Sequence, residues 1–85
     1  MLQTIIVFVY IPPPAMVWVR WGPSPSQLYA SGECFYWYPN YMYWIPVTFP
    51  TPEIYFQFFC KDYPNNKNKT GIFHIKVDWS GFFTG

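Results

Sequence analysis

Charged side chains are scarce in this chain of 85 residues. They make up 11% of the sequence, whereas an ordinary soluble domain carries roughly a quarter. The formal net charge is only +1, so the chain lacks the basic surface with which proteins bind the phosphates of nucleic acids. Weak charge also leaves little electrostatic repulsion between copies of the chain. We therefore expect protein subunits as partners, with self-association first among them, and no nucleic acid.

Residue types that perform catalysis or hold metal ions are equally few. The chain has one histidine, His74, together with four acidic residues and two cysteines. His74 and Asp78 share one face of an expected strand but lie about 13 Å apart along it, beyond hydrogen-bond reach. No nucleophile elbow, phosphate-binding loop or metal-ligand spacing is present. The sequence therefore predicts no enzymatic activity, no cofactor and no metal site.

Helical periodicity and targeting signals are missing as well. Ten prolines interrupt the chain, and no segment between them repeats apolar residues every 3.6 positions. Residues 1–19 carry no charge, and this length is close to that of a membrane span. Pro12, Pro13 and Pro14 end any helix within this segment, so a membrane span is not expected. The sequence shows no basic region and no cleavage site typical of a signal peptide. No cleavable signal peptide is therefore expected, and the compartment is left unassigned.

Residues that favour strands, β-branched and aromatic, fill the segments between these breaks. They predict an all-β fold: one domain, residues 1–85, built as a small antiparallel β-sandwich or barrel of six to seven short strands with Pro-rich turns. Turns are expected at residues 22–26, 31–32 and 39–40. The apolar run 2–11 is expected to be covered on both faces. The expected strands are residues 2–11, 15–21, 33–38, 41–45, 47–49, 53–61 and 72–79.

The clearest strand signal lies near the C-terminus. Residues 53–61 and 72–79 each alternate with a period of two, as half-buried antiparallel strands require. The polar residues 62–71 are expected to form the solvated tip of a hairpin that joins the two strands. The inward rows of this hairpin are expected to be Ile54, Phe56, Phe58, Cys60, Phe73, Ile75, Val77 and Trp79.

Two features concern covalent chemistry, and each has two interpretations. Cys34 and Cys60 either form a disulfide, which would contribute roughly 3–4 kcal/mol by constraining the unfolded chain, or are both buried free thiols. Asn68, Lys69 and Thr70 match the acceptor pattern for N-glycosylation on an expected exposed loop. Asn68 is thus a glycosylation candidate if the chain is secreted, and an ordinary polar loop residue otherwise.

Aromatic residues are abundant: the chain has five tryptophans, eight tyrosines and nine phenylalanines. A core of this size cannot bury them all, and clustered exposed apolar side chains mark interaction sites. Seven of the ten residues 35–44 are aromatic. The expected interface or ligand-stacking residues are Tyr36, Trp37, Tyr38, Tyr41, Tyr43 and Trp44.

These observations favour a non-catalytic structural subunit. It would pack through aromatic surfaces into a larger homo- or hetero-oligomer, such as a filament, a virion component or a multi-subunit complex. One alternative is a small carbohydrate-binding module, in which Trp37, Tyr38, Tyr41 and Trp44 stack on sugar rings. A second alternative is an accessory subunit of a membrane complex, with its aromatic rings in the lipid headgroup zone.

Overall fold

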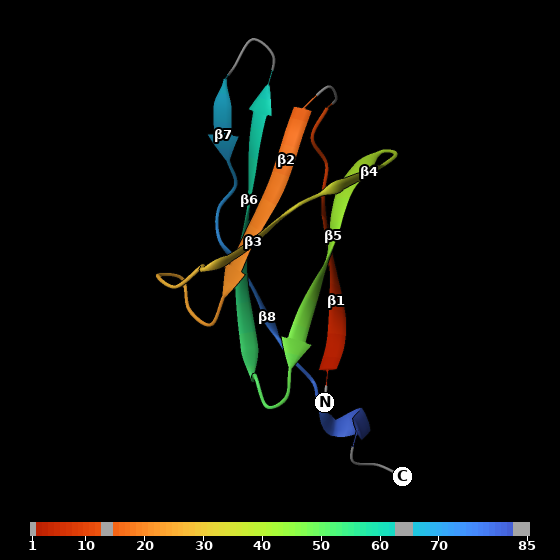
Figure 1. Ribbon diagram of the computed structural model, residues 1–85, viewed down its shortest axis with the longest axis vertical. Helices are drawn as coiled ribbons and strands as arrows, with labels where there is room; N and C mark the ends of the chain where they lie inside the picture. The colour runs from red at the N-terminus through yellow and green to blue at the C-terminus, as the bar shows by residue number, and fades with distance from the viewer. Residues whose placement is uncertain (1, 13–14, 63–65, 83–85) are drawn as a thin grey trace.

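The computed structural model describes residues 2–12, 15–62 and 66–82. These residues form eight strands and one short 3-10 helix, and every strand pairing among them is antiparallel (Figure 1). The all-β class expected from the sequence is confirmed at this level. No helix in the described ranges is long and apolar enough to cross a membrane. The elements are β1 (Leu2–Val9), β2 (Ala15–Gly22), β3 (Ala30–Glu33), β4 (Phe35–Trp37), β5 (Asn40–Thr48), β6 (Glu53–Asp62), β7 (Lys67–Lys69), β8 (Phe73–Lys76) and the helix η1 (Ser80–Phe82).

The strands form two sheets that run along the long axis of the molecule. Sheet A has the order β1-β5-β4, and sheet B has the order β3-β2-β6. The far edge of β6 is shared: β7 pairs with Phe59–Lys61 and β8 pairs with Glu53–Phe56. Figure 1 shows β6 and β2 on one side and β5 and β1 on the other. The described strands do not close into a barrel.

The chain crosses from sheet B to sheet A at Cys34, the residue between β3 and β4. In Figure 1 these two strands follow one diagonal path in front of the others. The Cys34 N–H donates to the carbonyl oxygen of Val17 at 2.8 Å, which anchors the crossing to β2. The chain returns to sheet B through the turn at residues 49–52, between β5 and β6. One predicted strand, residues 33–38, is therefore two short strands in different sheets.

Both sheets contribute to a single small core. Its most completely buried side chains are Val17, Val19 and Phe58 of sheet B and Ile45 of sheet A. Around them lie the other buried hydrophobic residues: Val7, Cys34, Tyr41, Val47, Ile54, Phe56 and Trp79. Aromatic residues are a minority of this core, although the chain is rich in them. Most aromatic side chains in the described ranges are thus half-buried or exposed.

The expectation that residues 2–11 are covered on both faces is wrong. Along β1 the exposure alternates, so Val7 is buried while Ile6 and Phe8 on either side of it are exposed. The physical reason is that the core shared with sheet B lies on one side of sheet A, and a strand turns successive side chains to opposite faces. Since the segment is apolar at successive positions, one of its two rows of side chains is apolar and exposed to solvent.

Two other sequence expectations need correction. Residues 31–32 are not a turn, because Gly32 lies within β3 opposite Val19. A Cβ atom at Gly32 would lie 2.4 Å from the Tyr43 ring, so this glycine permits close approach of sheet A rather than a turn. Residues 47–49 are not a separate strand, because β5 continues through Pro46. Since β4 pairs only with residues 40–42, Pro46 has a strand neighbour on one side alone, where proline is tolerated.

The predicted C-terminal hairpin exists in altered form. β8 pairs antiparallel with β6, with Ile75 opposite Ile54, as expected. The intervening residues 62–71 are not all loop, because Lys67–Lys69 form β7. Thr70 holds this segment in place: its hydroxyl accepts the Phe58 N–H at 3.1 Å, and its carbonyl accepts Gln57 Nε2 at 2.6 Å. Residues 63–65 of the expected loop, and Pro13 and Pro14 of the expected break, lie outside the described residues.

Candidate functional site

The face of sheet A that points away from sheet B carries apolar side chains on all three strands. Directly opposed residues in antiparallel strands point to the same side of a sheet. The pairings Ile6↔Trp44, Phe8↔Met42 and Phe35↔Met42 therefore place these side chains together. We call this surface outer face A. Its apolar members are Leu2, Ile6, Phe8, Phe35, Trp37, Met42, Trp44 and Pro46.

Outer face A is extensively exposed. Phe8 is 64% exposed and Trp37 is 71% exposed, while the rings of Phe35 and Trp44 lie 5.5 Å apart and join the strands into one patch. An aromatic side chain offers about 150–250 Å², so the large side chains of this face together expose on the order of 700 Å². The largest apolar patch on a typical monomer covers about 300–600 Å². Outer face A is therefore larger than a folded chain ordinarily leaves to water.

The opposite surface of the molecule, which we call outer face B, differs in charge. The outward rows of sheet B follow from the pairings Trp18↔Glu33, Phe59↔Lys69 and Glu53↔Lys76. No residue in the outward rows of sheet A is charged. The charged and titratable residues of outer face B are Arg20, Glu33, Glu53, Lys61, Lys67, Lys69, His74 and Lys76.

The six aromatic residues expected to form the contact surface divide between the two sides of sheet A. Trp37 and Trp44 belong to outer face A, and Tyr38 lies in the turn between β4 and β5, where it is 81% exposed. Tyr41 is buried in the core, and Tyr43 is half-buried against Trp21, with ring centroids 5.3 Å apart. Tyr36 is also exposed; it opposes Tyr41 on the inward side of the sheet, with ring centroids 5.0 Å apart.

Sequence reasoning missed the contribution of β1 to this surface. Leu2, Ile6 and Phe8 are exposed and share rows with β5, some 40 residues away in the chain. The absence of charge in residues 1–19 was visible in the sequence. What the sequence did not contain was the register that places β1 beside β5. A contact surface expected in one segment therefore spans two segments.

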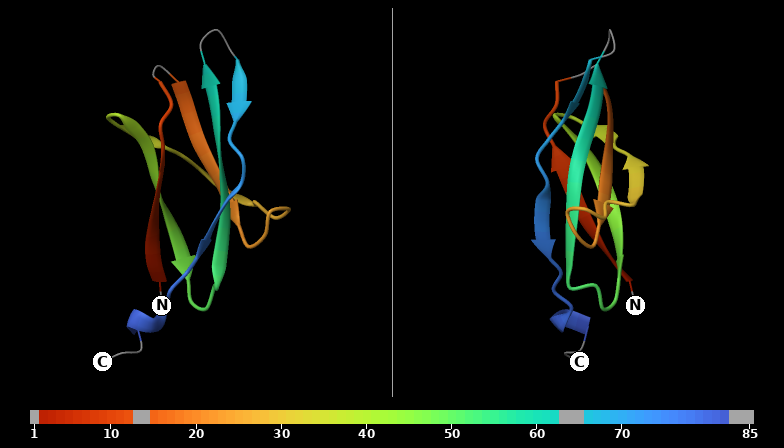
Figure 2. Two further views of the ribbon diagram at one scale, coloured as in Figure 1. Left: turned by 180° about the vertical axis from the view of Figure 1, so that it is seen from behind. Right: turned by 90° about the vertical axis from the view of Figure 1, so that its left-hand side faces the viewer.

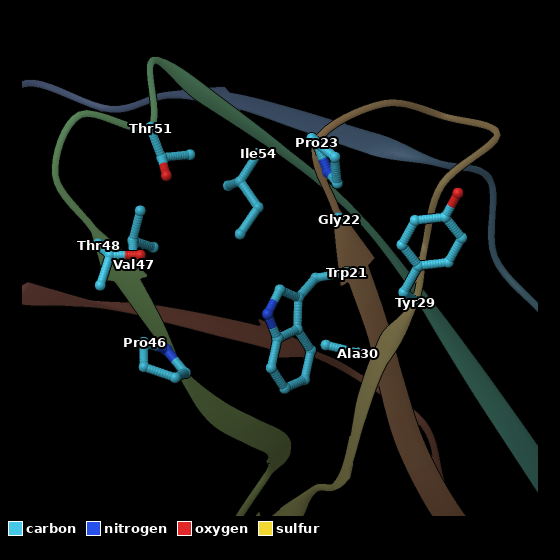
Figure 3. Close-up of a pocket in the computed structure, with 10 residues that line it drawn as sticks. All are labelled: Trp21, Gly22, Pro23, Tyr29, Ala30, Pro46, Val47, Thr48, Thr51 and Ile54. Atoms are coloured by element: carbon cyan, nitrogen blue, oxygen red, sulfur yellow. The ribbon is translucent and has the colours of Figure 1, made fainter.

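A pocket of about 330 Å³ opens where the ends of β2 and β5 meet (Figure 3). In Figure 3 the Trp21 indole lies between Pro46 of β5 and Ala30 of β3, and the Tyr29 ring lies further along the loop. Threonine hydroxyls from Thr48 and Thr51 supply polar groups. None of the ten lining residues is an acid, an amine, an imidazole or a thiol. The pocket has room for a small neutral group, and its polar side-chain groups are the hydroxyls of Tyr29, Thr48 and Thr51.

The two cysteines are free thiols in the structure. The backbone N–H of Cys34 donates to the carbonyl oxygen of Val17, and Val17 opposes Cys60 in the β2–β6 ladder. β2 therefore lies between the two cysteines. Two strand spacings amount to about 9.6 Å, which exceeds the roughly 7 Å across which a disulfide forms without backbone movement. Burial, with a smaller contribution from the charge of Glu33, raises the pKa of Cys34 to about 12. At neutral pH this thiol is a small hydrophobic core residue.

Asn68 lies in β7 and is exposed. Its Oδ1 accepts the Lys69 N–H at 3.2 Å. The Thr70 hydroxyl, the other half of the acceptor pattern, accepts from Phe58 N–H and donates to the Gly71 carbonyl. Glycosylation of Asn68 stays a prediction from the sequence.

His74 forms a hydrogen-bonded pair with Glu53 that the sequence did not predict. Its Nε2 lies 2.7 Å from Glu53 Oε2, and its ring stacks on Tyr55 with centroids 4.3 Å apart. The two residues lie on the paired strands β6 and β8, where the register sets Tyr55 opposite His74. In the part of the chain that the structure describes, no group of three or more metal-ligating side chains is assembled. The arrangement stabilises the β6–β8 pairing.

No family model, no curated protein and no solved structure matches this chain.

Proposed function

We propose that this protein is a non-catalytic structural subunit that assembles, first of all with other copies of itself, through outer face A. The observation that carries the proposal is an uncharged apolar patch on the order of 700 Å² on a chain of 85 residues. A standard protein interface buries about 800 Å² on each partner, so this face is close to the size of one complete contact surface.

We further infer that the two sheets are the layers of a small β-sandwich. Support comes from the core, in which Val17 and Phe58 of sheet B share one cluster with Val7 and Ile45 of sheet A. In such an architecture each sheet has one inner and one outer face, and an outer face is normally polar. Because the inner face of sheet A already contributes to the core, the apolar outer face A is part of the protein surface and not a second core that lacks its covering layer.

A protein partner fits this face better than a sugar. Tyr and Trp anchor protein interfaces, and the depletion of charge across the face is typical of an interface core. Sugar-binding sites combine aromatic rings with polar side chains that bond to hydroxyl groups, whereas the strands of outer face A supply only Thr4, Asn40 and Thr48. The carbohydrate alternative rests on Trp37 and Tyr38, which are highly exposed beside each other.

Sedimentation velocity across micromolar concentrations tests the proposal. We expect the wild-type chain to form species larger than a monomer, and Trp44→Lys to weaken association by at least tenfold. Met16→Lys is the matched control, because Met16 is also exposed but lies on outer face B. A wild-type chain that stays monomeric contradicts the proposal, and so does equal weakening by the two variants. Binding of the monomer to a glycan array, abolished by Trp37→Ala, would instead favour the carbohydrate module.

A further inference from the structure

The outward edge of β1 has no strand partner among the described residues. β1 pairs with β5 over its whole length and with no other described strand. Seen from behind in Figure 2, the chain after β8 reaches only the start of β1, where Gln3 Nε2 donates to the Asp78 carbonyl at 3.2 Å. An edge strand presents a row of unpaired N–H and C=O groups, which is a template for another strand.

The other described edges carry features that prevent strand addition, namely short strands, lysines and, in the part of β5 beyond β4, Pro46. β3 has four residues and β4 has three. β7 contains Lys67 and Lys69, and β8 contains Lys76. β1 has eight residues, with no charge, no proline and no glycine. The unprotected edge is therefore a specific property of β1.

The inward side chains of β1 are incompletely covered. Val7 is buried, but Ile5 and Val9, which point to the same side, are only half-buried. A strand at the end of a sheet has a neighbour on one side alone, so its side chains keep part of their surface exposed. A further strand beside β1 would cover these side chains as well as the backbone groups.

We infer that β1 pairs antiparallel with β1 of a second copy of this chain, about a two-fold axis at Ile6. This inference rests on the proposed function, names a second copy as its partner, and adds the β1 edge as a contact beside outer face A. Because opposed residues must point to the same side, a residue on the axis opposes itself. Thr4 then faces Phe8 of the second copy, and Ile5 faces Val7. β-Branched and aromatic pairs of this kind stabilise antiparallel sheets, and no like charges meet, because β1 has none.

Edge pairing with a second copy joins two copies of outer face A into one larger surface. A two-fold axis perpendicular to the joined sheet keeps both outer faces on the same side. The six-stranded sheet then presents on the order of 1,400 Å² of apolar surface, which exceeds the roughly 800 Å² per partner of a standard interface. Stacking of the joined outer faces would then extend the assembly.

Disulfide trapping in the full chain tests the register. Opposed residues in antiparallel strands have Cα atoms about 4.5–5.5 Å apart, a separation that disulfides bridge. We expect Ile6→Cys to form a covalent dimer on mild oxidation at least tenfold faster than the matched control Phe8→Cys. Phe8 is also exposed, but the two copies of residue 8 would lie about 13 Å apart along the strands. The wild-type chain gives the background from Cys34 and Cys60.

Charge complementation provides a second measurement. Ile6→Lys and Ile6→Glu should each be folded by circular dichroism and associate at least tenfold more weakly than wild type, and an equimolar mixture should recover association. Equal trapping of both cysteine variants, or no recovery in the mixture, would overturn edge pairing. If the wild type still sediments as an oligomer in that case, the proposed function stands and another surface carries it. If the wild type is a monomer, both proposals fail together.

Discussion

Outer face A and outer face B are built from the same strand geometry but differ in what occupies their outward rows. On outer face B, Arg20 lies over the Phe59 ring at 5.3 Å, and Trp18 stacks on the same ring at 6.0 Å. Aromatic surface there is covered by other side chains and surrounded by charge. On outer face A the rings of Phe35 and Trp44 contact each other and have no charged neighbour in their rows. Both faces carry aromatic rings, and they differ in the charge around those rings.

The largest expected effect separates the inner rows from outer face A. Phe58→Ala should lower the free energy of unfolding by about 3–5 kcal/mol, because Phe58 is 1% exposed and the change leaves a cavity. Phe8→Ala removes the same side chain from outer face A and should cost less than about 1 kcal/mol in the monomer. Urea unfolding at submicromolar concentration measures both. Similar losses in the two variants would mean that Phe8 is packed within the chain.

A smaller effect concerns the buried Cys34, where the chain crosses from sheet B to sheet A. The pKa of this thiol is about 12 in the folded chain and 9.0 when exposed, so above pH 9 the unfolded state releases a proton that the folded state keeps. Stability is therefore lost as the pH rises from 9 toward 12. Near pH 10.5 the loss should be about 1–2 kcal/mol.

Urea unfolding at pH 8 and near pH 10.5 measures this loss. Cys34→Ala is the control, because it keeps every tyrosine but removes the thiol. If the free energy of unfolding of the two proteins changed equally with pH, the result would contradict burial of the Cys34 thiol.

Salt should distinguish the faces without any mutation. Association through uncharged outer face A should change by less than about threefold between 0.05 and 0.5 M NaCl, since screening acts on charges. Association through the lysines of outer face B should weaken steeply over the same range. Sedimentation equilibrium at the two salt concentrations gives the answer, and a steep dependence would reverse the assignment of the interface.

The smallest expected effect is that of the hydrogen-bonded pair of Glu53 and His74 on outer face B. Glu53→Gln should cost less than about 1 kcal/mol, because exposed pairs gain little in water. A double-mutant cycle with His74→Gln isolates the pair and should give a coupling energy near 0.5 kcal/mol. A coupling energy above about 2 kcal/mol would show that the pair is shielded from water, and hence that another molecule also covers outer face B.

The part of the fold that depends on neighbouring residues could be predicted. Ile54, Phe56 and Phe58 are buried as expected, because period-two alternation is a local property of a strand. The role of Gly32 could not be predicted, since it depends on the ring of Tyr43 from the other sheet. The hydrogen-bonded pair of Glu53 and His74 likewise needed the β6–β8 register.

The candidate site was predicted in part, for the same reason. Trp37 and Trp44 lie on outer face A, within the aromatic segment that was visible in the sequence. Tyr41 lies in the same segment and is buried, because β5 turns alternate residues inward. Where both rows of side chains along a strand are apolar, no local pattern tells which row faces the core. Contacts with the other sheet determine it.

The sequence by itself determined that this chain is β-rich, poor in charge and too rich in aromatic residues to bury them all, because these properties depend on composition and local pattern. Tertiary structure alone decided where the excess lies. The core shared with sheet B lies on one side of sheet A, so the other rows of β1 and β5 remain exposed, and the outward edge of β1 has no strand partner among the described residues. Register and layer order arise from contacts between residues distant in the chain, and only those contacts turned surplus apolar side chains into one surface and one edge.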